Sequence, residues 1–240
     1  MVECIAVVLA GGTGSRMGDG PPKQLRTLGD RTVLEHSIAA FATHPEITGV
    51  LVMTDEASAE RVAELVAAGP ADRVLAVLPG GPTRFATTRA AVAGLAGFSD
   101  DAKVLLHDAA RPLVPADLVD ACLAGLDDHD GVVPVLPATD TLLAVDAGGV
   151  MERSLDRSVV RLAQTPQAFR LGTLRSSHLP AADGAEDDPT DDGTAVLRAL
   201  PGARIATVPG DRRNRKVTYP EDLELLGRWL AAEATAQTAD

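Results

Sequence analysis

The chain has 240 residues and a formal net charge of −12, and 45% of its residues are hydrophobic and 23% are charged. This length suits one substantial α/β domain, and no apolar run approaches the ~20 residues of a membrane span. The acidic balance argues against a general nucleic-acid-binding protein, because such proteins need a basic surface. We therefore expect one domain over residues 1–240 that binds neither membranes nor nucleic acids.

The first half of the chain alternates short β-branched runs with helical patterns. Runs that predict strands begin at Cys4 (CIAVVL), Gly49 (GVLVM), Arg73 (RVLAVL), Lys103 (KVLLHD) and Gly131 (GVVPVL). Helical spacing begins at Val33, Ser58, Thr87 and Pro115. This βαβ alternation predicts an α/β fold with a mostly parallel sheet flanked by helices, and a ligand crevice at the carboxyl ends of the strands.

The second half departs from this pattern. Residues 138–158 hold two short extended runs around the turn Asp146–Gly149, which predicts a projecting β-hairpin arm. A lone hairpin is marginally stable, so we expect the arm to pack on a second copy of the chain in a homodimer. The acidic segment 181–193 predicts a mobile loop and a candidate lid. A strand from Arg204 and a helix over 220–232 follow.

Two further features bear on the compartment. The first strand has no preceding basic region of the kind found in a signal peptide, and Cys4 and Cys122 lack the spacing of a disulfide framework or a metal site. We therefore expect a cytoplasmic protein with two buried thiols.

A glycine-rich turn, LAGGTGSRM over residues 9–17, follows the first strand. Glycines let backbone N–H groups approach a phosphate closely. Arg16 and Lys23 add positive charge there, in a chain whose lysines are Lys23, Lys103 and Lys216 alone. An ordinary tight turn is the alternative, but the neighbouring cations favour a triphosphate site.

Three other nucleotide-binding motifs do not fit this turn. A Walker A loop needs Gly-Lys-Ser/Thr, whereas Lys23 follows two prolines. The spacing from Thr13 to Gly20 matches the loose short-chain dehydrogenase pattern, but the only tyrosine, Tyr219, has no lysine four residues later. The third glycine of a dinucleotide-binding fingerprint is replaced by Met17. Hydride transfer is therefore not expected.

Seven motifs, in order along the chain, resemble those of one family. They are AGGTGSRM from Ala10, PKQ from Pro22, GGPTR from Gly80, HDAARP from His107, DT at Asp140, QTPQ from Gln164 and NRKVTYPEDL from Asn214. Together they resemble the 2-C-methyl-D-erythritol 4-phosphate cytidylyltransferase family. The resemblance implies a Rossmann-like nucleotidyltransferase fold, a homodimer formed through the arm, and Mg²⁺-dependent transfer of CMP from CTP to that polyol phosphate in the non-mevalonate isoprenoid pathway.

The resemblance also implies roles for residues around the nucleotide. The positions expected to contact CTP are Ala10, Gly11, Gly12, Arg16, Lys23, Gly80, Gly81, Thr87 and Asp108. Arg16 and Lys23 would hold the triphosphate, and Asp108 would lie beside the phosphates and the metal ion. Thr87 stands where the family usually has serine. Pro82 removes a backbone donor from the loop that borders the cytosine.

On the acceptor side, the resemblance implies contacts with the polyol phosphate from Asp108, Arg111, Thr141, Arg157, Thr165, Thr190 and Lys216. Arg157 would come from the arm of the neighbouring subunit, and Lys216 would reach the reacting phosphates. Leu143 and Arg215 depart from the family pattern. We expect Arg212, Arg213 and Arg215 to make the cleft unusually positive, and these departures leave the identity of the polyol open.

The expected chemistry needs no general base. A phosphate monoester is already largely ionised at neutral pH, since its second pKa is about 6. Catalysis would depend on positioning and on positive charge from Arg16, Lys23, Lys216 and Mg²⁺, so a structural role is expected for His107. A ribitol-5-phosphate cytidylyltransferase and a catalytically silent nucleotide-binding module are the alternatives.

Overall fold

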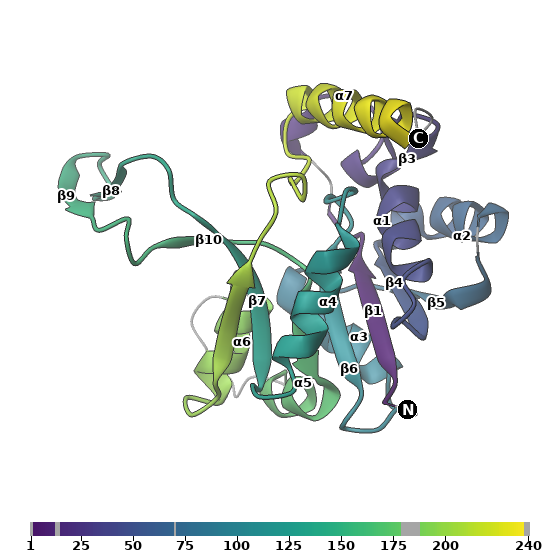
Figure 1. Cartoon of the computed structure of the whole chain (residues 1–240), viewed down its shortest axis with the longest axis horizontal. Coiled ribbons are helices and arrows are strands. Elements are labelled where there is room, and N and C mark those ends of the chain that lie inside the picture. Colours follow the sequence, from purple (N-terminus) through teal and green to yellow (C-terminus); the bar gives the residue numbers. More distant parts are fainter. Residues whose placement is uncertain (1, 13–14, 70, 179–187, 238–240) are drawn as a thin grey trace.

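A computed structural model describes residues 2–12, 15–69, 71–178 and 188–237. Its centre is an eight-stranded sheet in the order β10–β7–β11–β6–β1–β4–β5, with β12 paired to β7 (Figure 1). The strands are β1 (Cys4–Leu9), β4 (Gly49–Thr54), β5 (Val74–Pro79), β6 (Lys103–Asp108), β7 (Gly131–Pro137), β10 (Arg161–Ala163), β11 (Gln167–Arg170) and β12 (Ile205–Pro209).

The sheet is mostly parallel, as predicted. β1 pairs in parallel with β4 and β6, β4 with β5, and β7 with β12. β11 is inserted antiparallel between β6 and β7, and β10 is antiparallel to β7. The sequence did not predict β10 or β11, because three or four residues are too few for a pattern to identify.

Helices cover both faces of the sheet. One face packs on α1 (Val33–Ala42), α2 (Ala59–Ala68) and α4 (Ala116–Gly125), and the other on α3 (Arg84–Gly94), α5 (Leu171–Ser177) and α6 (Asp192–Ala199). Successive residues of β1 divide between the two cores, with Ala6 and Val8 in one and Ile5 and Val7 in the other. The alternation follows from the two-residue period of a strand, and it explains why this strand is apolar throughout.

The helix α7 (Pro220–Gln237) lies across the carboxyl end of β1 (Figure 1). Its Leu226 is buried with Met17, Leu28, Val33 and Val217. This small core holds α7 against the segment that follows the first strand. No described helix is both long and apolar enough to cross a membrane.

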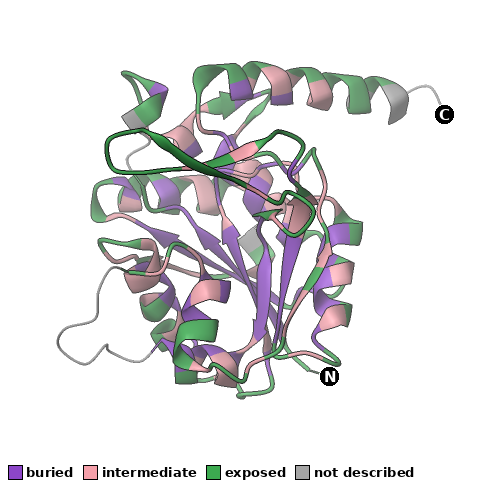
Figure 2. Cartoon of the chain, turned by 90° about the vertical axis from the view of Figure 1, so that its left-hand side faces the viewer, coloured by how far each residue is buried: buried purple, intermediate pink, exposed green. Residues whose placement is uncertain are grey.

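The predicted arm is a hairpin of β8 (Leu142–Val145) and β9 (Met151–Leu155) that projects from the body (Figures 1 and 2). Asp146 forms its turn, because Oδ1 accepts hydrogen bonds of 2.9 Å from the backbone N–H groups of Gly148 and Val150. The apolar side chains Leu143, Val145, Val150 and Met151 are 49–64% exposed.

Short elements complete the chain. They are the 3₁₀ turns η1 (Ser15–Met17), η2 (Lys23–Leu25), η3 (Glu56–Ser58) and η4 (Ala71–Arg73) and the paired strands β2 (Thr27–Leu28) and β3 (Arg31–Thr32). The helix predicted from Thr87 begins earlier, at Arg84, and α5 was not predicted. The predicted loop 181–193 is wrong at its end, because Asp192 and Gly193 are buried in the first turn of α6, which Asp191 caps by accepting from Thr194 N. Residues 181–187 of that loop lie outside the described residues.

Candidate active site

Two adjoining pockets open at the carboxyl ends of β1 and β6. The glycine-turn pocket, about 280 Å³, is lined by residues 9–12, 23–24, 81–84, 87, 108–110 and 216. The Thr165 pocket, about 230 Å³, is lined by Arg84, Asp108, Arg111, residues 163–165, Gln167, Thr190, Asp191 and Lys216. Arg84, Asp108 and Lys216 line both pockets and therefore form their shared boundary.

The backbone after β1 forms one wall of the glycine-turn pocket. Gly12 has φ +140°, a conformation that other residues rarely adopt. The buried side chain of Gln24 donates a 2.7 Å hydrogen bond to the carbonyl of Ala10. Gln24 thereby ties the η2 turn to the glycine turn and brings its neighbour Lys23 to the pocket. Burial lowers the pKa of Lys23, and nearby Lys216 lowers it further.

The loop before α3 forms another wall of the glycine-turn pocket. A Cβ on Gly81 would lie 2.5 Å from the Cβ of Ala86, so only glycine fits there. The hydroxyl of Thr87 donates to the carbonyl of Thr83 at 2.8 Å and accepts from the N–H of Gly81 at 3.0 Å. Thr87 therefore closes this loop as well as lining the pocket.

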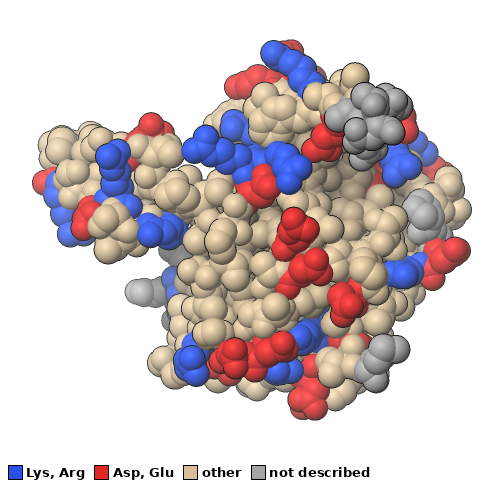
Figure 3. All heavy atoms as spheres, in the orientation of Figure 1, with Lys and Arg blue, Asp and Glu red and all other residues tan. Residues whose placement is uncertain are grey.

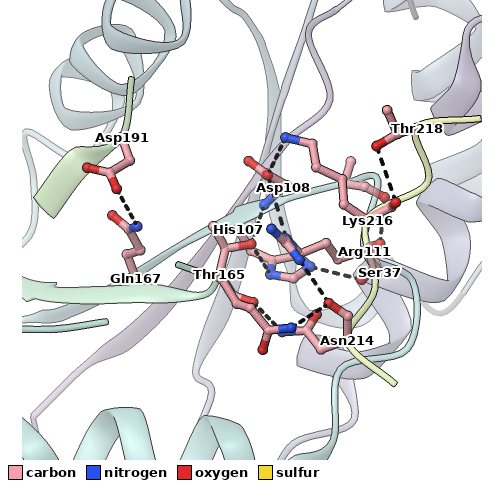
Figure 4. Close-up of polar contacts among 12 residues, drawn as sticks. Ser37, His107, Asp108, Arg111, Thr165, Gln167, Asp191, Asn214, Lys216 and Thr218 are labelled. Carbon is pink, nitrogen blue, oxygen red and sulfur yellow. Dashed lines mark hydrogen bonds and ion pairs between the residues drawn. The ribbon is translucent and has the colours of Figure 1, made fainter. Parts of the chain in front are cut away.

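Asp108 is the carboxylate at the centre of the shared boundary (Figure 4). Its Oδ2 lies 2.7 Å from Lys216 Nζ and 3.7 Å from Arg111 Nε, and its Oδ1 lies 3.4 Å from Arg84 Nε. Burial raises the pKa of Asp108, but the three cations outweigh burial and hold the pKa well below its ordinary value. One negative charge is thus surrounded by three positive charges, and the boundary carries a net positive charge.

A buried chain of hydrogen bonds fixes Asp108 from behind (Figure 4). The N–H of Asp108 donates to Thr165 Oγ1 at 3.1 Å, and Thr165 Oγ1 lies 3.1 Å from His107 Nδ1. His107 Nε2 lies 3.0 Å from the carbonyl of Arg111, which can only accept, so Nε2 carries the proton and Nδ1 accepts from Thr165. Burial lowers the pKa of His107 to about 4. A neutral, fixed imidazole agrees with the structural role expected from the sequence.

The segment that carries Lys216 is held by the same network (Figure 4). Asn214 is fully buried and donates to the carbonyl of Thr165 at 2.7 Å, while its own carbonyl accepts from Arg111 Nη1 at 2.9 Å. Lys216 stands two residues beyond this anchor, and the N–H of Val217 donates to the carbonyl of Ala110 at 2.7 Å. The motifs HDAARP, QTPQ and NRKVTYPEDL, which are far apart in the sequence, therefore meet around Asn214.

Most of the predicted site residues lie at these pockets. Ala10, Gly11, Gly12, Lys23, Gly81, Thr87, Asp108 and Lys216 line the glycine-turn pocket, and Asp108, Arg111, Thr165, Thr190 and Lys216 line the Thr165 pocket. Gly80, Arg16, Thr141 and Arg157 line neither. Gly80 precedes the lining loop, and Arg16 has its guanidinium 5.8 Å from the centre of the Tyr219 ring. Thr141 and Arg157 are exposed at the base of the arm, where Arg157 donates to the carbonyl of Thr139.

Two of the three arginines before Lys216 pair with carboxylates, contrary to the expectation that they add charge to the cleft. Arg213 pairs with Asp211 and Glu233, and Arg215 Nε lies 2.6 Å from Asp222 Oδ1 in the first turn of α7. Neither arginine lines the glycine-turn pocket or the Thr165 pocket, and nor does Arg212. The paired arginines join the Lys216 segment to neighbouring carboxylates and do not add charge to the cleft.

Several pocket residues lie within the quoted motifs but received no role from the sequence, and Arg84 and Gln24 are two of them. Arg84, the last residue of GGPTR, lines both pockets, and Gln24, the last of PKQ, holds the glycine turn. A charged residue at the start of a helix that follows a glycine pair would have been a usable signal for Arg84.

The described residues contain no group of three or more His, Cys, Asp or Glu side chains that could hold a metal ion. Asp108 is the only carboxylate among the described residues that line the glycine-turn pocket, and both of its oxygens already face cations. This donor set fits a metal ion that takes most of its ligands from phosphates, as Mg²⁺ does in many nucleotide sites.

A mostly parallel sheet with a glycine turn, two adjoining pockets and a cationic boundary defines an α/β enzyme that handles anionic substrates. The family model described as IspD, 2-C-methyl-D-erythritol 4-phosphate cytidylyltransferase, matches residues 4–231. The chain belongs to this family, and the resemblance drawn from its motifs is confirmed.

Individual relatives support this assignment. The chain is 40% identical over 222 residues to the 2-C-methyl-D-erythritol 4-phosphate cytidylyltransferase of Thermobifida fusca (strain YX), covering 91% of this chain and 89% of that protein. It is 35% identical to the bifunctional ribulose 5-phosphate reductase/CDP-ribitol pyrophosphorylase of Haemophilus influenzae, covering 91% of this chain but 46% of that protein. The chain likewise spans about half of the bifunctional IspD/IspF enzyme of Nitrobacter hamburgensis, at 52% of its length.

Solved structures agree with the fold. The 2-C-methyl-D-erythritol 4-phosphate cytidylyltransferase of Thermus thermophilus is 30% identical and superposes with a TM-score of 0.70, covering 94% of this chain and 98% of that one. A 4-diphosphocytidyl-2C-methyl-D-erythritol synthase, 28% identical, gives a TM-score of 0.77 over 96% of this chain. The expected nucleotidyltransferase fold is confirmed.

Proposed function

We propose that this enzyme transfers CMP from CTP to 2-C-methyl-D-erythritol 4-phosphate and releases pyrophosphate. The observation that carries the proposal is the pair of adjoining pockets that share Arg84, Asp108 and Lys216. The glycine-turn pocket would hold CTP and the Thr165 pocket the polyol phosphate. A reaction between two anionic substrates needs such a cationic boundary, because their phosphates repel each other.

In this proposal the acceptor phosphate attacks the α-phosphorus of CTP, and the bond to the leaving pyrophosphate breaks. Lys23 and the backbone of Ala10 to Gly12 would bind the triphosphate, with Arg16 closing over it. Lys216 would neutralise charge at the boundary, and Arg111, Thr165 and Thr190 would orient the acceptor. No side chain has to remove a proton, since the attacking phosphate is already ionised.

Mg²⁺ is part of the proposal as a partner of CTP. Asp108 would hold it together with the phosphate oxygens of CTP, and the ion would neutralise charge on the triphosphate. To do so, Asp108 would share its charge among the metal ion and its three cationic neighbours.

The homodimer and the cytoplasmic location are also proposals. The exposed apolar side chains of the arm support a dimer, because a projecting hairpin with such a surface gains stability by packing on a partner. The dimer would bring Thr141 and Arg157 of one arm to the Thr165 pocket of the neighbouring subunit. The arm also carries charged side chains of both signs (Figure 3), which suits pairing with an identical copy.

The test is pyrophosphate release by the purified protein with Mg²⁺ and each combination of CTP, UTP or ATP with 2-C-methyl-D-erythritol 4-phosphate or ribitol 5-phosphate. We expect release with CTP and the methylerythritol phosphate. Preference for ribitol 5-phosphate would favour the alternative, which the Haemophilus relative motivates. No release with any pair would favour the silent nucleotide-binding module.

A further inference from the structure

Arg84 pairs with the buried carboxylate of Asp192, and the proposed reaction assigns no role to this ion pair. Arg84 starts α3 and its side chain is 24% exposed, whereas Asp192 starts α6 and is 1% exposed. Arg84 Nη1 donates to Asp192 Oδ2, while Nε faces Asp108 at 3.4 Å. The guanidinium thus lies between two carboxylates from different elements.

Asp192 is itself tightly fixed. Its Oδ1 accepts a 2.8 Å hydrogen bond from the hydroxyl of Thr88 and lies 3.7 Å from His178 Nε2. His178 stacks on Phe85, the residue after Arg84, with ring centres 4.9 Å apart. Burial raises the pKa of Asp192, but Arg84 and the hydrogen bonds outweigh burial and lower it, so the group is a carboxylate at neutral pH.

A second contact joins the same two regions. The hydroxyl of Thr83 donates to Asp188 Oδ2. Residues 188–192 supply Thr190 and Asp191 to the Thr165 pocket, and residues 81–84 line the glycine-turn pocket. The two segments are therefore joined by two side-chain contacts. Thr83 and Arg84 thus link the walls of the two pockets through their hydrogen bonds to Asp188 and Asp192.

The guanidinium still has donors to offer. Of its nitrogens, Nε and Nη1 face carboxylates, and Nη2 makes no hydrogen bond with the described residues. Arginine presents its N–H groups in a rigid fork that matches phosphate oxygens, which a lysine cannot reproduce. A guanidinium held on one side and open on the other, at a boundary between two anionic substrates, is arranged to contact phosphate.

We propose that Arg84 is a phosphate-binding residue that contacts both substrates at the shared boundary, and that Asp192 is the positioning residue that holds its guanidinium there. The inference rests on the proposed function, since it takes the two pockets to bind CTP and a polyol phosphate. Asp192 lines neither pocket, so in this proposal it acts on the reaction through Arg84.

The test is a double-mutant cycle with Arg84→Ala and Asp192→Asn, measured as KM for CTP and for the acceptor. Each single variant should raise both KM values by about tenfold or more, the usual effect of losing one charged hydrogen bond. In the Arg84→Ala background, Asp192→Asn should add less than about a twofold change, because its target is gone. A purely structural Asp192 would lower the melting temperature and leave the KM values unchanged.

A further variant and a control allow the proposal to be tested even if Asp192→Asn folds poorly. Arg84→Lys keeps the charge but not the fork, so it should raise both KM values nearly as much as Arg84→Ala. Asp100→Asn breaks another Asp–Arg pair, with Arg175, whose residues line neither pocket, and should leave both KM values unchanged. Wild-type KM values in Arg84→Lys, or full additivity in the cycle, would overturn the proposal.

Calorimetric titration of CTP into the same variants separates this inference from the proposed function. A wild-type protein that binds CTP but releases no pyrophosphate would contradict the proposed function alone. Arg84→Ala and Asp192→Asn should then still weaken CTP binding by about tenfold. Unchanged CTP affinity in both variants would contradict the role of Arg84 at the nucleotide.

Discussion

Lys23 is a cation of the glycine-turn pocket whose pKa is lowered, so its charge depends on pH in the alkaline range. Burial and the nearby charge of Lys216 lower its pKa from the ordinary value of 10.5. As the pH rises, Lys23 loses its proton earlier than an exposed lysine, and the pocket loses a cation. We therefore predict that kcat/KM for CTP falls as the pH rises, and that the fall begins at a lower pH than the ordinary lysine pKa of 10.5 would give. A profile of kcat/KM recorded from pH 7 to 10 checks this.

The matched variant is Lys23→Arg, because arginine stays charged over this whole range. It should remove the alkaline decline, whatever its effect on the plateau. Lys23→Ala should fold normally but turn over at least about tenfold more slowly at pH 7. An identical alkaline decline in wild type and Lys23→Arg would mean that another group titrates.

At the scale of one element, the start of α7 controls where Lys216 lies. Asp222 is 2% exposed, and its Oδ2 accepts hydrogen bonds of 2.9 Å from the N–H groups of both Thr218 and Tyr219. Asp222→Ala leaves these two donors without an acceptor, so we predict a loss of about 2 kcal/mol in the free energy of unfolding, measured with urea. Turnover should fall as well, because the same turn follows Lys216.

Two neighbours serve as controls for this prediction. Glu221→Ala changes an adjacent exposed carboxylate and should alter stability by less than about 0.5 kcal/mol. Arg215→Ala removes a partner whose side chain is 51% exposed, so its effect should stay below about 1 kcal/mol. Equal stability of Asp222→Ala and Glu221→Ala would rule out the proposed role of this turn.

The elements also show how far the sequence could predict the fold. The six-residue apolar run of β1 and the shorter run Val104–Leu106 in β6 are visible in the sequence, because burial on both faces of the sheet favours apolar residues. The insertion of β11 between β6 and β7 is not, since strand order is set by packing between distant segments. For the same reason the motifs indicated Asp108 and Lys216, but not that Arg84 meets Asp192, which lies 108 residues away in sequence.

At the scale of the whole molecule, the arm raises the question of how many chains make one site. Thr141 and Arg157 lie on the arm and line neither pocket of their own chain. The body of one chain brings Arg111 to the Thr165 pocket, and the arm of another would bring Arg157. If both are needed, a dimer has two sites, and each site takes one arginine from each chain.

This arrangement makes a quantitative prediction for mixed dimers. Arg157→Ala and Arg111→Ala should each be nearly inactive as homodimers. Mixing the two unfolded chains and refolding them together should restore roughly a quarter of wild-type turnover, because half of randomly paired dimers are mixed and each has one intact site. Refolding Arg157→Ala with a chain that carries both substitutions supplies no intact arm and should restore nothing. Sedimentation should show dimers in every mixture, and equally low activity in both mixtures would place the complete site within a single chain.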